Sequence, residues 1–167
     1  MTSLFLAPAT GRSGAYNHFC KTILEGVPQE RYSQFIDEKK KHTRIWGLSS
    51  SFKSTWKNAK RGDWVLFYTQ KNQYEYAGQI ISKQHNSEFG ESIREDFLEN
   101  VSKDRDWDYL LFFDEPIEIS VSGDTISELV NYSNSYPVRF IRVANKRLDV
   151  IETQYGGVDK FINSIRR

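Results

Sequence analysis

Between Gly47 and Ser54 the sequence GLSSSFKS differs at a single position from the phosphate-binding loop pattern G-x-x-x-x-G-K-[ST]. Phe52 stands where the second glycine should be, at the point where the backbone must curl closely around a phosphate. The residues before the stretch, DEKKKHTR, are charged and polar, whereas a phosphate-binding loop follows a buried strand. We therefore expect no nucleotide hydrolysis here and look for another role for these residues.

Metal and nucleophile chemistry has little support elsewhere in the sequence. The three histidines, His18, His42 and His85, are far apart and lack the spacing of a metal site such as H-x-x-x-H. No G-x-S-x-G nucleophile turn is present. We expect no bound metal, no cofactor and no catalytic residue, which makes this chain a binding domain rather than an enzyme.

An acidic cluster offers the one enzymatic alternative, a small metal-dependent nuclease. Such a site needs an acid and a lysine presented together on adjacent strands, and no acid-x-Lys pattern completes the set. A solvated acidic turn is the preferred interpretation. The cluster consists of Asp104, Asp106, Asp108, Asp114 and Glu115.

Composition describes an ordinary globular protein. The chain has 167 residues, of which 38% are hydrophobic and 27% charged, so we expect a single domain over residues 1–167. One cysteine, Cys20, rules out an intrachain disulfide and a cysteine zinc cluster. There is no signal peptide pattern and no apolar run long enough to cross a membrane, so a cytoplasmic location is expected.

Charge is unevenly distributed along the chain although the net charge is only +1. Residues 39–62 contain eight Lys or Arg and no acid, and residues 137–147 contain four and no acid. Residues 86–118 contain eleven acids against three bases. Two basic segments beside aromatic strands favour a polyanion as partner, and the alternative is that these lysines simply face solvent.

Hydrophobic periodicity predicts short strands interleaved with helices, and hence an α+β fold with a strongly curved sheet or small β-barrel flanked by helices. In the helix expected after Ser51, Phe52 and Trp56 should pack inward, while Lys53 and Lys57 face outward. Gly78 indicates a bulge or a close backbone approach. Strands are expected at 3–7, 43–48, 64–69, 74–82, 107–113, 116–121, 137–143 and 148–151, and helices at 15–26, 28–41, 52–61, 87–101, 124–131 and 158–167.

Several motifs in a fixed order resemble the EVE and YTH branch of the PUA-like superfamily. They are a strand ending in Trp46-Gly47-Leu48, a short basic helix, the turn and strand KRGDWVLFY, and the strand YEYAGQI. The later segments WDYLLFFDEPIEI and YPVRFIRV resemble the closing part of such a domain, so the resemblance runs from Ser3 to about Ile151. Domains of this kind also occur at the N-terminus of McrB proteins in modification-dependent restriction systems.

The resemblance implies a reader that flips a methylated base of double-stranded DNA into an aromatic cage. The base would be 5-methylcytosine, 5-hydroxymethylcytosine or N6-methyladenine. A longer protein or complex would add an NTPase motor and a nuclease, with this chain as its N-terminal part. An RNA-binding PUA- or YTH-like module is the alternative.

The resemblance also assigns site residues. Trp46 matches the cage tryptophan, and Gly47, Leu48 and Ser49 would contact the base edge. The sequence lacks the usual second tryptophan before Trp107, so the second wall would come from Phe89, Phe97 or Trp107. Asn17 is a candidate hydrogen-bonding residue. The DNA backbone would meet Lys41, Arg44, Lys53, Lys57, Arg139 and Arg142.

Overall fold

The computed structural model describes residues 1–11, 14–37, 39–96 and 106–167. Within these residues the strands form one eight-stranded sheet in the order β2-β3-β6-β5-β4-β1-β8, with β7 pairing to β5 beside this path. The strands are β1 (Leu4–Pro8), β2 (Val27–Pro28), β3 (His42–Leu48), β4 (Trp64–Gln70), β5 (Gln73–His85), β6 (Tyr109–Phe113), β7 (Ile117–Ser122) and β8 (Ile141–Arg142).

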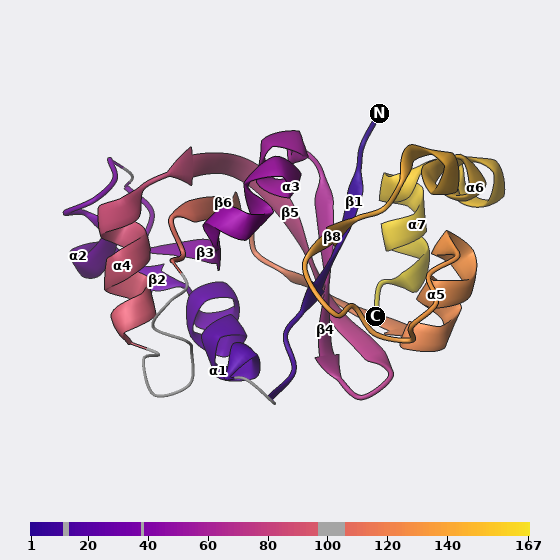
Figure 1. Cartoon of the computed structure of the whole chain (residues 1–167), viewed down its shortest axis with the longest axis horizontal. Helices are drawn as coiled ribbons and strands as arrows, with labels where there is room; N and C mark the ends of the chain where they lie inside the picture. The colour runs from indigo at the N-terminus through magenta and orange to yellow at the C-terminus, as the bar shows by residue number, and fades with distance from the viewer. Residues whose placement is uncertain (12–13, 38, 97–105) are drawn as a thin grey trace.

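Helices lie at both ends of this sheet (Figure 1). On one side lie α1 (Ala15–Phe19), which continues into the π-helical turn η2 (Cys20–Glu25), α2 (Gln29–Tyr32) and α4 (Ser87–Glu95). The 3-10 turn η3 (Ser50–Phe52) leads into α3 (Lys53–Asn58). On the other side lie α5 (Gly123–Val130), α6 (Asn145–Tyr155) and α7 (Val158–Ile165).

The long strand β5 curls the sheet. Its first half pairs with β4 on one edge and β7 on the other, and its second half pairs with β6. Register shifts between Tyr74 and Tyr76 and between Ile80 and Ser82 mark irregularities of the kind that bend a strand and increase its twist. β1 is parallel to β4, and the other strand pairs are antiparallel. The expected α+β fold with a strongly curved sheet is confirmed.

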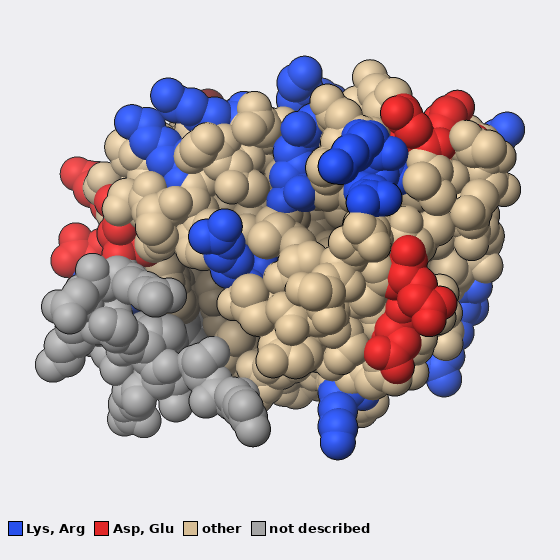
Figure 2. All heavy atoms as spheres, turned by 45° about the vertical axis from the view of Figure 1, so that its right-hand side comes forward, with Lys and Arg blue, Asp and Glu red and all other residues tan. Residues whose placement is uncertain are grey.

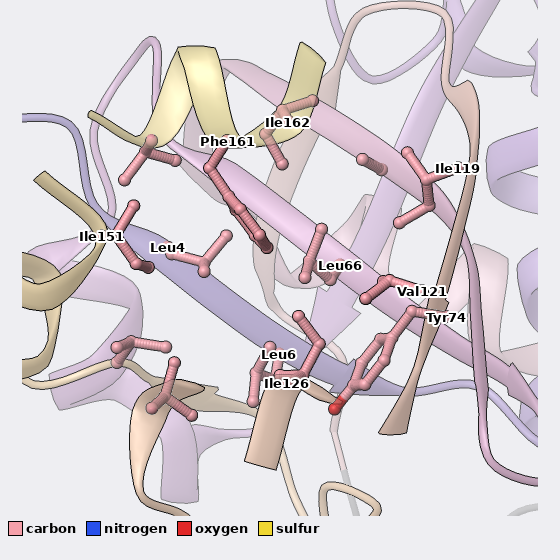
Figure 3. Close-up of a cluster of buried hydrophobic side chains, with 14 of the residues drawn as sticks. Leu4, Leu6, Leu66, Tyr74, Ile119, Val121, Ile126, Ile151, Phe161 and Ile162 are labelled. Atoms are coloured by element: carbon pink, nitrogen blue, oxygen red, sulfur yellow. The ribbon is translucent and has the colours of Figure 1, made fainter. Parts of the chain in front are cut away.

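Both faces of the central strands are buried, which explains their continuous apolar sequences. Leu4 and Leu6 of β1 point into a core shared with Phe161 of α7 and Ile126 of α5 (Figure 3). Phe5, between them, points to the opposite face and joins a second core cluster that contains Trp46. The first cluster anchors α5–α7, and the second forms the support of the candidate site.

Three sequence-based expectations about the secondary structure are wrong. Residues 148–151 belong to the helix α6, because Leu148 and Ile151 share one buried side of it at helical spacing. Only residues 141–142 of the expected strand 137–143 form β8. The helix expected over 28–41 ends at Tyr32, whose hydroxyl bonds the carbonyl of Lys40 as the chain turns back.

The stretch that resembles a phosphate-binding loop is a strand followed by a helical turn. Gly47 lies within β3, paired with Leu110 of β6, so it cannot begin a phosphate-binding curl. Phe52 and Trp56 are partly buried against the second core cluster, as expected from their spacing. Gly78 marks a close approach, because a Cβ there would lie 2.9 Å from Cδ1 of Phe113.

Candidate functional site

Three aromatic rings form a parallel stack near the end of β3. The His18 imidazole lies between two indoles, with ring centroids 4.4 Å from Trp46 and 4.1 Å from Trp107. The interplanar angle is 8° on both sides. The two tryptophans are therefore the walls of a slot that holds one flat ring.

The first wall is held by β3 and the core beneath it. Trp46 pairs with Leu111 of β6 in the strand ladder, and its indole meets the rings of Phe67 and Phe19 edge-on, at 5.6 and 6.4 Å. Edge-to-face packing of this kind adds to the area that each ring buries. Trp46 is thus both a core residue and a wall of the slot.

The second wall depends on two glycines. Trp107 comes just before β6 and packs directly against Gly47, because a Cβ on Gly47 would lie only 2.9 Å from the Cβ of Trp107. On the other side, a Cβ at Gly90 of α4 would lie 2.5 Å from the Trp107 carbonyl oxygen. Gly47 therefore contributes by letting Trp107 approach β3.

A carboxylate fixes the turn next to Trp107. Asp106 accepts hydrogen bonds from the Ser50 amide and hydroxyl, both at 3.1 Å, and so joins the start of η3 to the second wall. Burial raises the pKa of Asp106, but the hydrogen bonds to its carboxylate, those from Ser50 foremost, together outweigh it and leave the pKa below its usual range. The Ser51 hydroxyl does not cap α3 and lies 2.7 Å from the hydroxyl of Ser49.

The imidazole in the slot is neutral. Burial lowers the pKa of His18 to about 3, because the charged ring would lose its hydration there. The His18 carbonyl accepts a hydrogen bond from the Thr22 hydroxyl at 2.9 Å, and its amide donates to Gly14 at 3.0 Å. These bonds hold the His18 backbone in the helix.

The basic helix α3 is attached to the strand that follows Trp107. The Trp56 indole donates to the Leu110 carbonyl of β6 at 3.0 Å. Lys83 of β5 lies over the Trp56 ring at 4.7 Å and donates to the carbonyls of Trp56 and Lys57 at the end of α3. Lys53 and Lys57 are exposed, as expected.

The remaining basic residues of the predicted backbone contact fall into two groups. Lys41 and Arg139 are exposed. Arg44 is half-buried and donates to the Leu24 carbonyl at 2.6 Å, and Arg142 donates to the Ser3 hydroxyl at 3.0 Å. One face of the molecule carries Lys and Arg side chains around a shallow hollow, with acidic groups toward its sides (Figure 2).

The other predicted base contacts lie in different places. Leu48 and Ser49 are buried at the end of β3. Asn17 is exposed beside His18 and lines a cavity of about 270 Å³ between η2 and α4. Phe89 is buried and stacks on Phe35, with ring centroids 5.0 Å apart, so its ring serves the core. Phe97 lies outside the described residues.

In the described part of the chain the acidic cluster falls into two groups, Asp106 with Asp108 beside Trp107, and Asp114 with Glu115 in the turn before β7. Asp106 is bonded to Ser50, and Asp114 accepts from the Glu115 amide at 3.0 Å in the turn before β7. Burial raises the pKa of Asp108, opposed by a hydrogen bond from Ser87. Among the described residues, no group of three or more His, Cys, Asp or Glu is arranged to hold a metal ion. Asp104 lies outside them.

Neither a protein-family model nor a curated protein matches this sequence. The structure is similar to that of the N-terminal domain of Thermococcus gammatolerans McrB bound to m5C DNA, with a TM-score of 0.69. The match covers 91% of this chain and 96% of that one, at 23% sequence identity. This chain has the fold of the McrB N-terminal domain. An ASCH protein from Zymomonas mobilis matches more weakly, with a TM-score of 0.48 and 8% identity over 90% of this chain and 94% of that one.

The McrB-like fold confirms the resemblance seen in the motifs. It also explains how two walls that are far apart in the sequence come together in space, since β3 and β6 are neighbours in the sheet. The sequence motifs predicted Trp46 as a cage residue and Trp107 as one of three candidates for the second wall. They did not indicate His18, which was considered only as a metal ligand. In the described part of the chain, every helix is too short or too polar to span a membrane.

Proposed function

We propose that this chain is a non-catalytic reader of a modified base in double-stranded DNA and holds the flipped base between Trp46 and Trp107. The observation that carries the proposal is the parallel arrangement of the two indoles around a single flat ring. A base in such a slot would stack on both of its faces, which is what an aromatic cage requires.

The energetics of base flipping are compatible with this slot. Extruding a base from the duplex costs a few kcal/mol. Stacking of a base on an aromatic side chain contributes about 1–3 kcal/mol, and two indoles would offset most of the extrusion cost. Hydrogen bonds to the base edge, for which Ser49 and Asn17 are candidates, would supply the remainder and the discrimination between bases.

The McrB fold supports DNA as the partner. The McrB domain with this fold is described as bound to m5C DNA, and we extend that partner to this chain as part of the proposal. The exposed Lys53 and Lys57 on α3, with Lys41 and Arg139, would contact phosphates. Arg44 and Arg142 already bond to the protein and would contribute less.

A pyrimidine fits the slot better than a purine. The ring now held between the indoles is an imidazole, and a six-membered pyrimidine is closer to it in area than the fused rings of adenine. We therefore place 5-methylcytosine and 5-hydroxymethylcytosine before N6-methyladenine. We further propose that residues 1–167 form one targeting domain, and that a motor and a nuclease belong to a longer protein or a complex.

The proposal is tested by fluorescence anisotropy with four duplexes that differ in one central base: cytosine, 5-methylcytosine, 5-hydroxymethylcytosine or N6-methyladenine. We expect a modified-cytosine duplex to bind at least tenfold more tightly than the unmodified one at physiological salt. Trp46→Phe and Trp107→Phe keep an aromatic ring in the core but present a smaller stacking face, and both should reduce that ratio. Equal affinities for all duplexes, or tighter binding of a matched RNA, would refute the proposal.

A further inference from the structure

The slot between the two tryptophans is filled by a side chain of the protein itself. His18 stacks on both indoles with nearly parallel planes, at 4.4 and 4.1 Å. Its ring is flat, aromatic and carries nitrogen atoms, as a nucleobase does. The side chain is buried, so the slot is closed to solvent in this state.

We propose that His18 is an internal placeholder for the base: its imidazole fills the slot and must leave before a flipped base can enter. The inference rests on the proposed function, since a slot that never receives a base needs no placeholder. It makes His18 a positioning residue whose departure is coupled to binding. The cost of removing it sets a threshold that an unmodified base, with fewer contacts, would fail to meet.

The helix that carries His18 is built to allow this exchange. α1 is only five residues long, begins after Gly14 at φ 75°, and changes at Cys20 into the π-helical turn η2. π-helical turns distort the regular hydrogen-bond pattern and are frequent at functional sites. Tyr16 and Asn17, the residues before His18, are exposed, so α1 itself lies at the surface of the protein. A short helix with irregular ends can reorient at lower cost than a long regular one.

The charge of the imidazole differs between the two positions. In the slot, burial lowers the pKa of His18 to about 3. Outside it, the ring regains water and a pKa of about 6.5. Protonation therefore favours the displaced state, and the advantage grows as the pH falls below about 6.5. Burial alone accounts for the lowered pKa of His18. The titratable and charged groups on the elements around the ring are Tyr16, Cys20 and Lys21 on α1 and η2, Arg44 on β3, Arg94 and Asp96 on or after α4, and Asp106 and Asp108 beside Trp107.

The size of the effect follows from these two values. Between pH 7.5 and pH 5.5 the protonated fraction of a displaced His18 rises from about one tenth to about nine tenths. Linkage then tightens the binding of a modified duplex by about tenfold over this range, relative to the unmodified duplex. Using the ratio of the two affinities removes the general effect of pH on phosphate contacts.

The test measures that ratio by anisotropy at pH 7.5 and 5.5, in wild type and His18→Phe. Phenylalanine fills the slot but cannot be protonated, so the ratio should be smaller than in wild type and independent of pH. His85→Phe is the matched control, because His85 also stacks on an aromatic ring, Tyr109 at 4.4 Å, but is exposed. It should keep the tenfold response.

A second variant tests occupancy directly. His18→Ala empties the slot, and a modified duplex should bind about fivefold more tightly or better, because the two stacking contacts of His18 need not be broken. Added imidazole should compete with the modified duplex in His18→Ala and leave the wild type unaffected. Thermal unfolding of both variants establishes that they are folded at the assay temperature.

The outcomes separate this inference from the proposed function. If wild type and both variants bind modified and unmodified duplexes equally, the proposed function fails. If wild type prefers the modified duplex but its ratio is independent of pH and His18→Ala binds no more tightly, the placeholder is refuted and the reader stands. Weaker modified-duplex binding by His18→Ala would also overturn the inference, because it would make His18 a contact of the bound base.

Discussion

Gly47→Ala is a small change that should move one wall of the slot. A Cβ at residue 47 would lie 2.9 Å from the Trp107 Cβ and 3.2 Å from its carbonyl oxygen. Carbon atoms in contact sit about 3.5–4 Å apart, so Trp107 must retreat by roughly 0.5 Å or more. The indole would no longer lie parallel to Trp46 at the distance that holds a flat ring.

The expected magnitudes follow from this displacement. Overpacking by one methyl group costs about 1–3 kcal/mol of unfolding free energy. For a chain of this length that corresponds to a drop in Tm of about 2–12 °C. Partial loss of one stacking face should weaken binding of a modified duplex by about fivefold, near 1 kcal/mol, while unmodified duplex binding stays the same.

Gly78→Ala is the matched control for this prediction. Its Cβ would lie 2.9 Å from Phe113 and 3.3 Å from Phe67, which packs against Trp46, but it would not touch Trp107. It should lower the Tm by a similar amount and leave the preference for the modified duplex intact. The assay is anisotropy with thermal unfolding on the same samples. If Gly47→Ala lost stability yet bound the modified duplex as wild type does, Trp107 would not be a wall of the binding slot.

Three further substitutions separate binding from stability. Lys53→Gln should weaken all duplexes equally and reduce the slope of log affinity against log salt by about 0.9, the value for one phosphate contact, as measured by salt titration. Arg44→Gln should leave that slope unchanged and lower the unfolding free energy by about 1–3 kcal/mol in urea titrations, because its hydrogen bonds go to backbone carbonyls. Asp106 has a lowered pKa, so its contribution to stability is present above its unfolded pKa and lost as the pH falls through its folded value. Wild type should therefore lose more stability than Asp106→Asn between pH 5 and pH 3, and equal losses would contradict the role given to the hydrogen bonds from Ser50.

The positions of most strands along the chain and the first wall of the slot could be predicted because their signals are local. The apolar runs of β1, β4 and β6 are unambiguous, and Trp46 sits within a short motif of fixed order. Residues 148–151 were misassigned because LDVI is apolar and β-branched enough for a strand, and packing against α5 and α7 selects the helix. Intrinsic preference is too weak to decide such short segments.

The second wall could be narrowed only to three candidates, and the ring in the slot could not be predicted, for a different reason. Trp107 reaches Trp46 only through the pairing of β3 with β6 and the space left by Gly47 and Gly90. Nothing in the sequence distinguishes a histidine that stacks between two indoles from one on a helix surface. Such contacts depend on the relative positions of distant elements, which periodicity does not encode.

The most direct test of the central claim is whether the modified base leaves the helix when the protein binds. A 2-aminopurine placed next to a central 5-methylcytosine reports loss of stacking as an increase in fluorescence. We predict an increase on binding of wild type to the methylated duplex, little change with the unmodified duplex, and a reduced increase with Trp107→Phe. Tight, methylation-dependent binding without any increase would contradict the account, because the base would then be recognised while it remains stacked in the duplex.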